Sequence, residues 1–515
     1  MIKKTTLLSF TFLGFLFTTG YGQTISARII DSTSKQPVPF ATILLAKENG
    51  VISNDEGKFT LIIEKENTKT DSIHISCIGY KTKGIAIAQF KDSLIYLAPQ
   101  PIELNSVIVS NKNYSAEEII ALVKENMAKN YNNSLTKKRM FFRESSYQNM
   151  NKIKYSKLKS SIAAFNGSFL DSVISSVPKS GDHYTEVLLD LYGNLEPEPQ
   201  KIKLIKASEL YDKSTELDFE DLEEKFNDII KKNVKTDSYF KIKSGLFGTK
   251  VDSDEIFEKE VDSSDVAALN KELEKKKERK ENWQKNFAKY RKQRVSGLFK
   301  ELFLNEKSKL NFIRKSGKYV FSVRNLTYLG NDAVYILDFV PDGGADYEGT
   351  LYVNADDFAI MRVDYDNVKS VKSFKLLGVS MNQYRAKGKI IFYKDPISGL
   401  YNLRYLEKEE GTAIGVKRPL KIIEKNKNVK GRRKQNQLSL KMDLAFSSSS
   451  KLEIVVYNTE NINTTDFDAF AEKNNVLPKY MPNYDPEFWK GHQIIEPNKA
   501  IKEFTSTEEI VFTED

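Results

Sequence analysis

The chain has 515 residues, of which 40% are hydrophobic and 11% aromatic, so it can bury substantial cores and is not intrinsically disordered. Its 79 basic and 70 acidic residues leave a net charge of only +9, which gives no reason to expect a nucleic-acid partner. The length suggests roughly three domains of about 150 residues each, and a single cysteine, Cys77, excludes an intramolecular disulfide.

The first 22 residues have the parts of a secretory signal peptide. Lys3 and Lys4 form the positive segment, residues 5–19 are apolar, and residues 20–22 supply small side chains for cleavage before Gln23. The alternative is a membrane anchor, but the apolar run is shorter than the ~20 residues that a spanning helix needs. We therefore predict an exported protein with no transmembrane span in the mature chain.

Short apolar runs alternate with turn residues over the next 85 or so positions, a pattern typical of a small β-sandwich. Seven strands are expected, at residues 25–29, 40–46, 51–53, 59–63, 71–78, 94–97 and 107–109.

Residues 54–57 predict a tight turn in which Gly57 can adopt a positive φ angle. We expect this turn to join the strand before it to the strand after it as partners. Asp55 and Glu56 could be Ca²⁺ ligands, but the further oxygen ligands that Ca²⁺ requires are lacking, so a plain turn is favoured. His74 alternates with apolar neighbours and is expected to be a strand residue, not a metal ligand.

Two segments of this region carry a family resemblance. Residues 54–59, NDEGKF, and residues 75–80, ISCIGY, resemble the carboxypeptidase regulatory-like domain, a transthyretin-like β-sandwich. That domain begins many exported outer-membrane proteins, including TonB-dependent receptors, and carries no catalytic group. The resemblance implies an architecture for residues 23–110 and a place in the periplasm or at the outer membrane, but no activity.

The chain then departs from the TonB-dependent receptors, in which a plug domain would follow the segment that resembles residues 104–109. Here Ser115 and Glu118 are spaced as a capping box, which predicts a helix. A helix at this position resembles exported proteins that share the N-terminal domain, some of which continue into an outer-membrane barrel. The charged end at residues 510–515 and the lack of regular ten-residue alternation argue against a barrel.

Residues 111–300 combine helical and strand patterns with many lysines. The strongest pattern predicts a helix at residues 265–294, whose glutamates can pair with basic residues one turn away. A helix lying on an acidic membrane or packing on a partner is the alternative, but a solvated helix is favoured because residues 271–280 have almost no apolar face. The other expected elements are strands at 140–147 and 152–158, joined by a turn, and helices at 207–211 and 219–231.

Residues 301–515 predict a long antiparallel sheet followed by a tail. Residues 347–354 and 358–363 resemble the curved half-barrel of periplasmic lipoprotein carriers, which shelter an acyl chain under a twisted sheet. The expected strands are residues 319–323, 333–340, 349–353, 359–365, 384–393, 400–408, 438–446 and 451–457.

Two further features of this region suggest contacts. The basic cluster at residues 425–435 is expected to be a surface loop, with contact to lipid A phosphates or acidic glycan as the alternative. In the tail, Phe488 and Trp489 are expected to anchor the chain onto the sheet.

No pattern identifies a catalytic site, a metal site or a cofactor. The chain has no zinc-hydrolase motif, nucleophile elbow or phosphate-binding loop. Because a carboxylate pair leaves no sequence signature, Asp338, Asp364 and Asp366 are candidates only in a weak sense. The three histidines are far apart in the sequence: His74, His183 and His492.

The expected fold is multidomain α+β, mostly β. It comprises a signal peptide (1–22), an Ig/transthyretin-like β-sandwich (23–110), a mixed helical middle (111–300) and a curved antiparallel sheet (301–515). The favoured function is a non-enzymatic exported cell-envelope protein that binds an outer-membrane protein, polysaccharide or lipid at the outer membrane or in the periplasm, without nucleic acid. The alternative is a hydrolase of unrecognised type acting on envelope or extracellular glycan.

Overall fold

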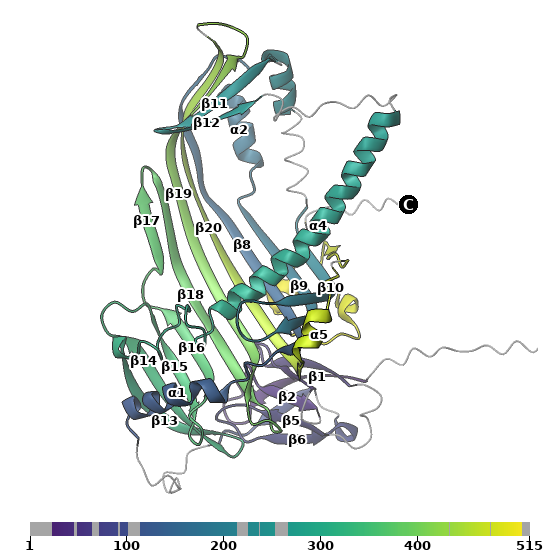
Figure 1. Ribbon diagram of the computed structural model, residues 1–515, viewed down its shortest axis with the longest axis vertical. Coiled ribbons are helices and arrows are strands. Elements are labelled where there is room, and N and C mark those ends of the chain that lie inside the picture. The colour runs from purple at the N-terminus through teal and green to yellow at the C-terminus, as the bar shows by residue number, and fades with distance from the viewer. Residues whose placement is uncertain are drawn as a thin grey trace, which may run out of the picture.

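The computed structural model describes residues 23–506 except 46–48, 64–71, 91–92, 101–113, 214–224, 236, 253–265, 432 and 474. The expected signal peptide and the expected strand at 107–109 lie outside the described residues. As expected, the protein is mostly β, with a sandwich-like N-terminal domain and one large sheet (Figure 1). Within the described part of the chain, no helix has the length and apolar character needed to cross a membrane.

The N-terminal domain consists of two small sheets around a shared core. One sheet has the strand order β4-β1-β7 and the other β3-β2-β5-β6. Alternate residues of each strand face the core, such as Ile25, Ala27 and Ile29 of β1. The strands are β1 (Gln23–Asp31), β2 (Thr42–Leu45), β3 (Asn49–Ile52), β4 (Lys58–Ile63), β5 (Ser72–Ser76), β6 (Lys83–Ala86) and β7 (Leu94–Leu97).

The turn at residues 54–57 connects the two sheets and does not close a hairpin. β3 pairs with β2, whereas β4 pairs with β1, so the predicted pairing across this turn is wrong. The turn itself is confirmed: Oδ1 of Asn54 accepts hydrogen bonds from the backbone N–H groups of Glu56 and Lys58, and Gly57 has a φ of +73°. Turn residues alone do not show whether the flanking strands pair, because a sandwich also uses tight turns to pass between its sheets.

The remaining strands form one 14-stranded sheet. Its main path is β13-β14-β15-β16-β18-β19-β20-β8-β9-β10-β21, with β17 beside β18 and the β11–β12 hairpin beside β19. β8, β19 and β20 extend far beyond the sandwich (Figure 1). The bounds are β8 (Thr136–Ser160), β9 (Ser180–Gly193), β10 (Lys201–Tyr211), β11 (Ser238–Ser244), β12 (Phe247–Asp252), β13 (Tyr319–Leu329), β14 (Asp332–Pro341), β15 (Tyr347–Asn354), β16 (Ile360–Asn367), β17 (Lys372–Leu376), β18 (Val379–Lys394), β19 (Tyr401–Asn426), β20 (Lys434–Asn461) and β21 (Lys479–Met481).

Three local predictions within this sheet are wrong. The expected turn at residues 148–151 is a bulge at Asn151 inside the continuous strand β8, and β20 continues through residues 447–450. Residues 207–211 belong to strand β10 instead of a helix. Polar and serine-rich segments remain extended here because strands on both sides supply their backbone hydrogen bonds.

The two faces of the sheet have different coverings. On β8, Met140 and Phe142 join the core on one face, while Phe141 joins the core that includes the sandwich. The first face is covered by α1 (Ala116–Asn130) and by the C-terminal half of α4 (Val266–Lys300), which crosses the long strands (Figure 1). Further helices are α2 (Gly167–Ser176), a helix at residues 225–233, α5 (Thr464–Ala469) and α6 (Lys499–Lys502), with the 3₁₀ turns η2 (Ile87–Gln89), η4 (Ser316–Lys318) and η5 (Pro486–Trp489).

Both long helices were predicted. The predicted start of α1 is confirmed, and α4 matches the predicted helix at residues 265–294 over most of its length. The capping box of α1 is confirmed, because Oγ of Ser115 accepts from the N–H of Glu118 and the Glu118 carboxylate accepts from the N–H of Ser115. In α4 the described side chains of residues 277–286 are exposed, as expected for a solvated helix, but Phe287 and Phe299 are buried against the sheet.

The sheet draws strands from both sides of residue 300. β8, β9 and β10 precede that position and β13 to β20 follow it. The predicted domain division at residue 300 therefore does not coincide with an edge of the sheet.

Lys138 on β8 makes the stability depend on pH. Its ammonium group is buried, hydrogen-bonded to Thr136 and the carbonyl of Gly193, and burial lowers its pKa from 10.5 to about 7. Between these two values the unfolded chain holds a proton that the folded chain has released, so raising the pH favours folding. The free energy of unfolding should rise by about 1 kcal/mol per pH unit between pH 7 and 10. Denaturant unfolding of Lys138→Met should lack this slope; an unchanged slope would contradict the assignment.

Candidate functional site

A row of polar and charged side chains crosses the large sheet on the face that the sandwich covers. Each member is the cross-strand partner of the next, on β14, β15, β16, β18, β19, β20, β8 and β9 in turn. We call these residues the charged row: Asp338, Thr350, Asp364, Lys389, Glu407, Glu453, Arg143 and Glu186.

Arg143 lies at the most buried part of the row and is 2% exposed. Its Nη2 lies 2.6 Å from Oε1 of Glu186 and donates to the carbonyl oxygen of Ile495 in the tail at 2.7 Å. Burial works against the guanidinium charge, but Glu186 and Glu453 outweigh it and raise the pKa of Arg143. Trp489 completes the group, because its Nε1 donates to Oε2 of Glu186 at 2.8 Å.

Lys451 links the row to the sandwich. Its Nζ lies 3.0 Å from Glu407, 3.3 Å from Glu453 and 2.9 Å from Asp55 in the sandwich turn. The hydroxyl of Tyr405 lies 2.8 Å from Glu407 and 3.1 Å from Glu453. Burial is the largest cause of the raised pKa of Glu407; Lys451 opposes it and Glu453 adds to it. The row thus joins the sheet, the sandwich and the tail, and its charges on β19, β20, β8 and β9 are buried between them.

The three candidate aspartates are engaged by neighbouring groups. Asp338 and Asp364 lie in the charged row on β14 and β16, with β15 between them; Arg324 Nε donates to Asp338 at 2.7 Å and Arg362 Nη2 lies 2.7 Å from Asp364. Asp366 lies further along β16, where its Oδ1 accepts from the next backbone N–H. The structure therefore brings two of the three into one row, each paired with an arginine.

The structure shows no metal centre among the residues it describes, since no three His, Cys, Asp or Glu side chains gather there in a suitable group. His74 is on β5, as expected, and Asp55 is an ion-pair partner of the sheet. The other two histidines lie on β9 and in the tail: His183 and His492.

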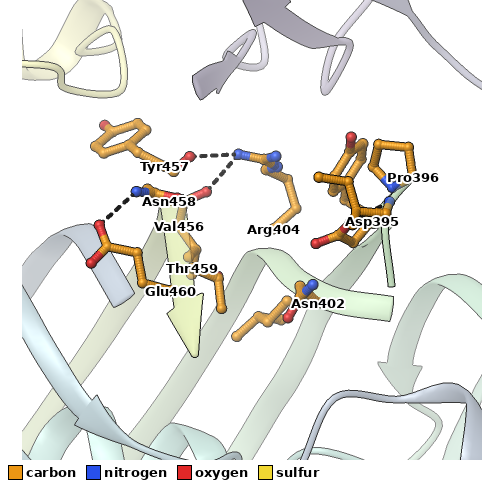
Figure 2. Close-up of a pocket in the computed structure, with 12 residues that line it drawn as sticks. Asp395, Pro396, Asn402, Arg404, Val456, Tyr457, Asn458, Thr459 and Glu460 are labelled. Carbon is orange, nitrogen blue, oxygen red and sulfur yellow. Dashed lines mark hydrogen bonds between the residues drawn. The ribbon is translucent and has the colours of Figure 1, made fainter. Parts of the chain in front are cut away.

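A polar pocket of about 310 Å³ surrounds Arg404 at the lower end of β19 (Figure 2). Arg404 and Tyr457 are bulged out of register with β18 and β8, and the pairing of β19 with β20 ends at Tyr405. The Nη1 of Arg404 donates instead to the carbonyls of Val456 and Tyr457, at 2.8 and 3.2 Å. The guanidinium therefore replaces backbone hydrogen bonds where the two strands separate.

Arg404 forms no ion pair with any residue that the structure describes, and burial lowers its pKa to about 10. The two carboxylates in the pocket wall are engaged elsewhere. Asp395 accepts from the backbone of its own turn, and Glu460 accepts from Asn458 (Figure 2) and also from Lys137. Arg404 therefore has a structural role, because its side chain holds the ends of β19 and β20 together.

A second, apolar pocket of about 190 Å³ lies at the opposite end of the sheet, which we call the distal pocket. It forms where the ends of β8, β19 and β20 meet β11 and the helix at residues 225–233. Its wall consists almost entirely of carbon atoms. The apolar lining residues are Ile162, Phe165, Phe226, Ile230, Val234, Phe240, Ile242, Ile422 and Leu438.

Glu424 holds the rim of the distal pocket together. This buried carboxylate accepts hydrogen bonds from the backbone of Lys235 at 3.1 Å, from Ser238 Oγ at 2.7 Å and from Asn436 Nδ2 at 2.7 Å. Because these donors come from the end of the helix, from β11 and from β20, one side chain ties three elements together. The pocket is therefore largely pre-formed.

Part of this pocket was indicated by the sequence. The apolar stripe in the expected helix at residues 219–231 includes Phe226 and Ile230, although residues 219–224 lie outside the described residues. The basic cluster at residues 425–435 is a loop in its central part, because the described residues 427–431 and 433 lie between β19 and β20, while its ends belong to those two strands. Nothing local indicated that Phe165 or Phe240 would join them.

Comparison with known proteins identifies the N-terminal domain. Residues 25–109 match the family model of the CarboxypepD_reg-like domain, so this part of the chain is a carboxypeptidase regulatory-like domain, as predicted. No curated protein matches the chain.

Two solved structures align over much of the chain. A proposed outer membrane lipoprotein-sorting protein domain from Vibrio parahaemolyticus aligns at 9% identity over 68% of this chain and 97% of that chain, with a TM-score of 0.19. The MucA/MucB complex of Pseudomonas aeruginosa aligns at 6% identity over 64% and 93%, with a TM-score of 0.13. At these TM-scores neither alignment establishes a common fold.

Proposed function

We propose that this protein is a non-enzymatic exported protein of the cell envelope, periplasmic or associated with the outer membrane, that holds an acyl chain of a lipid in the distal pocket. The observation that carries the proposal is the carbon-lined wall of that pocket. Export is supported by the signal-peptide pattern of residues 1–22 and by the N-terminal domain.

The size and chemistry of the pocket suit an alkyl chain. Its volume of about 190 Å³ exceeds the ~150 Å³ of an apolar cavity that stays free of water and takes up benzene. Each methylene group moved from water into such a wall contributes about 0.8 kcal/mol. A polysaccharide would leave its hydroxyl groups without partners there, which costs free energy.

The surroundings of the pocket favour a lipid with an anionic head group. Glu424 and Asn436, on its rim, lie directly on either side of the basic loop between β19 and β20. Arg433 of that loop and Lys434 at the start of β20 are exposed. An acyl chain in the pocket would thus place its head group beside cationic side chains, which suit phosphate oxygens.

The glycan hydrolase alternative needs two accessible carboxylates that face one cleft. Asp338 and Asp364, which lie in one row, are instead each bound by an arginine. This observation favours the binding protein.

Native mass spectrometry of protein purified gently from its own envelope tests the proposal, with extraction and identification of any bound lipid. The wild-type protein should carry an acyl lipid. Val234→Phe, which fills the pocket, should lower the lipid-bound fraction roughly tenfold, because about two methylene contacts are lost.

Lys232→Phe is the matched control, because it adds the same ring at an exposed position in the last turn of the helix that ends directly before Val234. It should leave the bound fraction unchanged. Protein that carries no lipid, or Val234→Phe protein that keeps it, would overturn the acyl-chain proposal. Co-purification of a protein partner without lipid would indicate an assembly component instead.

A further inference from the structure

Two hairpin tips lie beside each other at one edge of the long strands, and Arg418 of β19 joins them. Its Nε donates to Ser244 Oγ at 2.9 Å and its Nη2 to the Ser244 carbonyl, at the tip of the β11–β12 hairpin. Its Nη1 donates at 3.0 Å to the carbonyl of Leu377, in the turn between β17 and β18. The guanidinium also lies 5.1 Å from the ring centre of Phe247.

The side chains at these two tips are apolar and exposed. Leu246 is 90% exposed, Phe247 60%, Leu376 67% and Leu377 53%. We call these four residues the paired tips. Single exposed apolar residues are common, but a group at the ends of two adjoining hairpins marks an interaction surface.

The backbone angles of the two turns give a second reason to regard the leucines at the tips as part of an interaction surface. Leu377 has a φ of +49° and is followed by Gly378 at +81°, so both lie in the left-handed region that hairpin turns usually give to Asn and Gly. A leucine there is strained as well as exposed. In the other turn Gly245 has a φ of +62° and is followed directly by Leu246. Each hairpin thus places a leucine where a polar residue would stabilise the turn better.

The charges around the paired tips are mostly basic. Lys417 is exposed, and its only described ion pair is a long one of 3.8 Å with Asp443, which also binds Lys152 at 2.6 Å. Among the described residues, three more lysines close to the tips form no ion pair: Lys243, Lys372 and Lys375. Exposed apolar side chains surrounded by lysines are typical of a surface that meets an anionic bilayer.

We propose that the paired tips insert into the surface of an anionic lipid bilayer. The leucines and Phe247 enter the boundary between head groups and acyl chains, while the lysines contact the lipid phosphates. β11 carries Phe240 and Ile242 of the distal pocket and leads directly into one tip, so insertion brings the pocket near the bilayer. The inference goes beyond the proposed function, because insertion does not require that the pocket hold a lipid.

Vesicle co-sedimentation of the chain without residues 1–22 tests this inference. Vesicles of phosphatidylethanolamine with phosphatidylglycerol should bind the protein, less strongly as salt is added, and vesicles of phosphatidylcholine alone should bind it poorly. The variant Leu246→Ser/Phe247→Ser/Leu376→Ser/Leu377→Ser should bind at least tenfold more weakly, because each apolar group contributes to insertion.

Two single variants serve as controls. Ile397→Ser removes an 83% exposed side chain from the turn at the other end of β18 and should bind like wild type. Leu377→Asn relieves the turn and should raise the melting temperature while weakening binding, which a purely structural tip would not do.

Equal binding to both vesicle types, or unchanged binding of the four-residue variant, would overturn the inference. A failure of the proposed function is distinguishable, because Val234→Phe should lose bound lipid yet still sediment with anionic vesicles.

Discussion

Replacing Arg143 with methionine is expected to lower the free energy of unfolding by about 3–5 kcal/mol. Methionine fills much of the same volume but leaves the buried carboxylate of Glu186 without its cation, and Glu453 keeps only Lys451. It also removes the hydrogen bond to the carbonyl of Ile495, which connects the sheet to the tail. The large cost arises because a charge left unpaired inside a protein cannot be solvated.

Urea unfolding followed by circular dichroism measures this cost, and the charged row supplies its own control. Arg324 pairs with Asp338 at the exposed end of the row. Arg324→Met should cost less than about 1 kcal/mol, because water already screens that pair. Equal costs for the two variants would show that burial does not set the strength of the row.

The N-terminal sandwich could be predicted because its information is local. Ile25, Ala27 and Ile29 alternate with polar residues, and the alternation survives as the buried face of β1. What could not be read was which strands pair across Gly57, because a turn fixes a change of direction and leaves the partner open.

The extent of the long strands was predicted wrongly for a different physical reason. Beyond residue 146 much of β8 is partly or fully exposed, so the strand no longer alternates between a buried and a polar face. Residues 148–151 then resemble a turn although residues 148 and 149 pair with both β9 and β20, and residue 150 pairs with β20. The opposite error arose at residues 207–211, where Ala207 and the polar Ser208 are both buried, so the apolar residues of this part of β10 do not alternate.

The charged row and the distal pocket depend on register between strands far apart in the sequence. Arg143, Glu186 and Glu453 become neighbours only when β8 pairs with both β9 and β20. No spacing rule links positions separated by 43 residues, as Arg143 and Glu186 are, or by the several hundred that separate both from Glu453. The anchoring role of Trp489 could be predicted, because a large aromatic residue in a polar tail must find a buried partner.

Replacing Trp489 with alanine is expected to cost about 3–5 kcal/mol of unfolding free energy. Its indole is buried, packs edge-on against Phe141 with 5.4 Å between ring centres, and donates to Glu186. The tail that it anchors then reaches the sandwich, where Oε1 of Gln493 accepts from the N–H of Ile62 at 3.2 Å. Trp489→Ala should therefore also increase hydrogen exchange along β4.

Trp489→Phe separates packing from the hydrogen bond. It keeps most of the contact with Phe141 but leaves Oε2 of Glu186 without its donor, so it should cost about 1–3 kcal/mol. Because Arg143 and Trp489 share Glu186, the double variant Arg143→Met/Trp489→Phe should cost less than the sum of the single variants. Strict additivity would mean that the two side chains hold the tail independently. A cost of the double variant below the sum of the two single costs would show that Glu186 is the common point through which the sheet, the tail and the sandwich are joined.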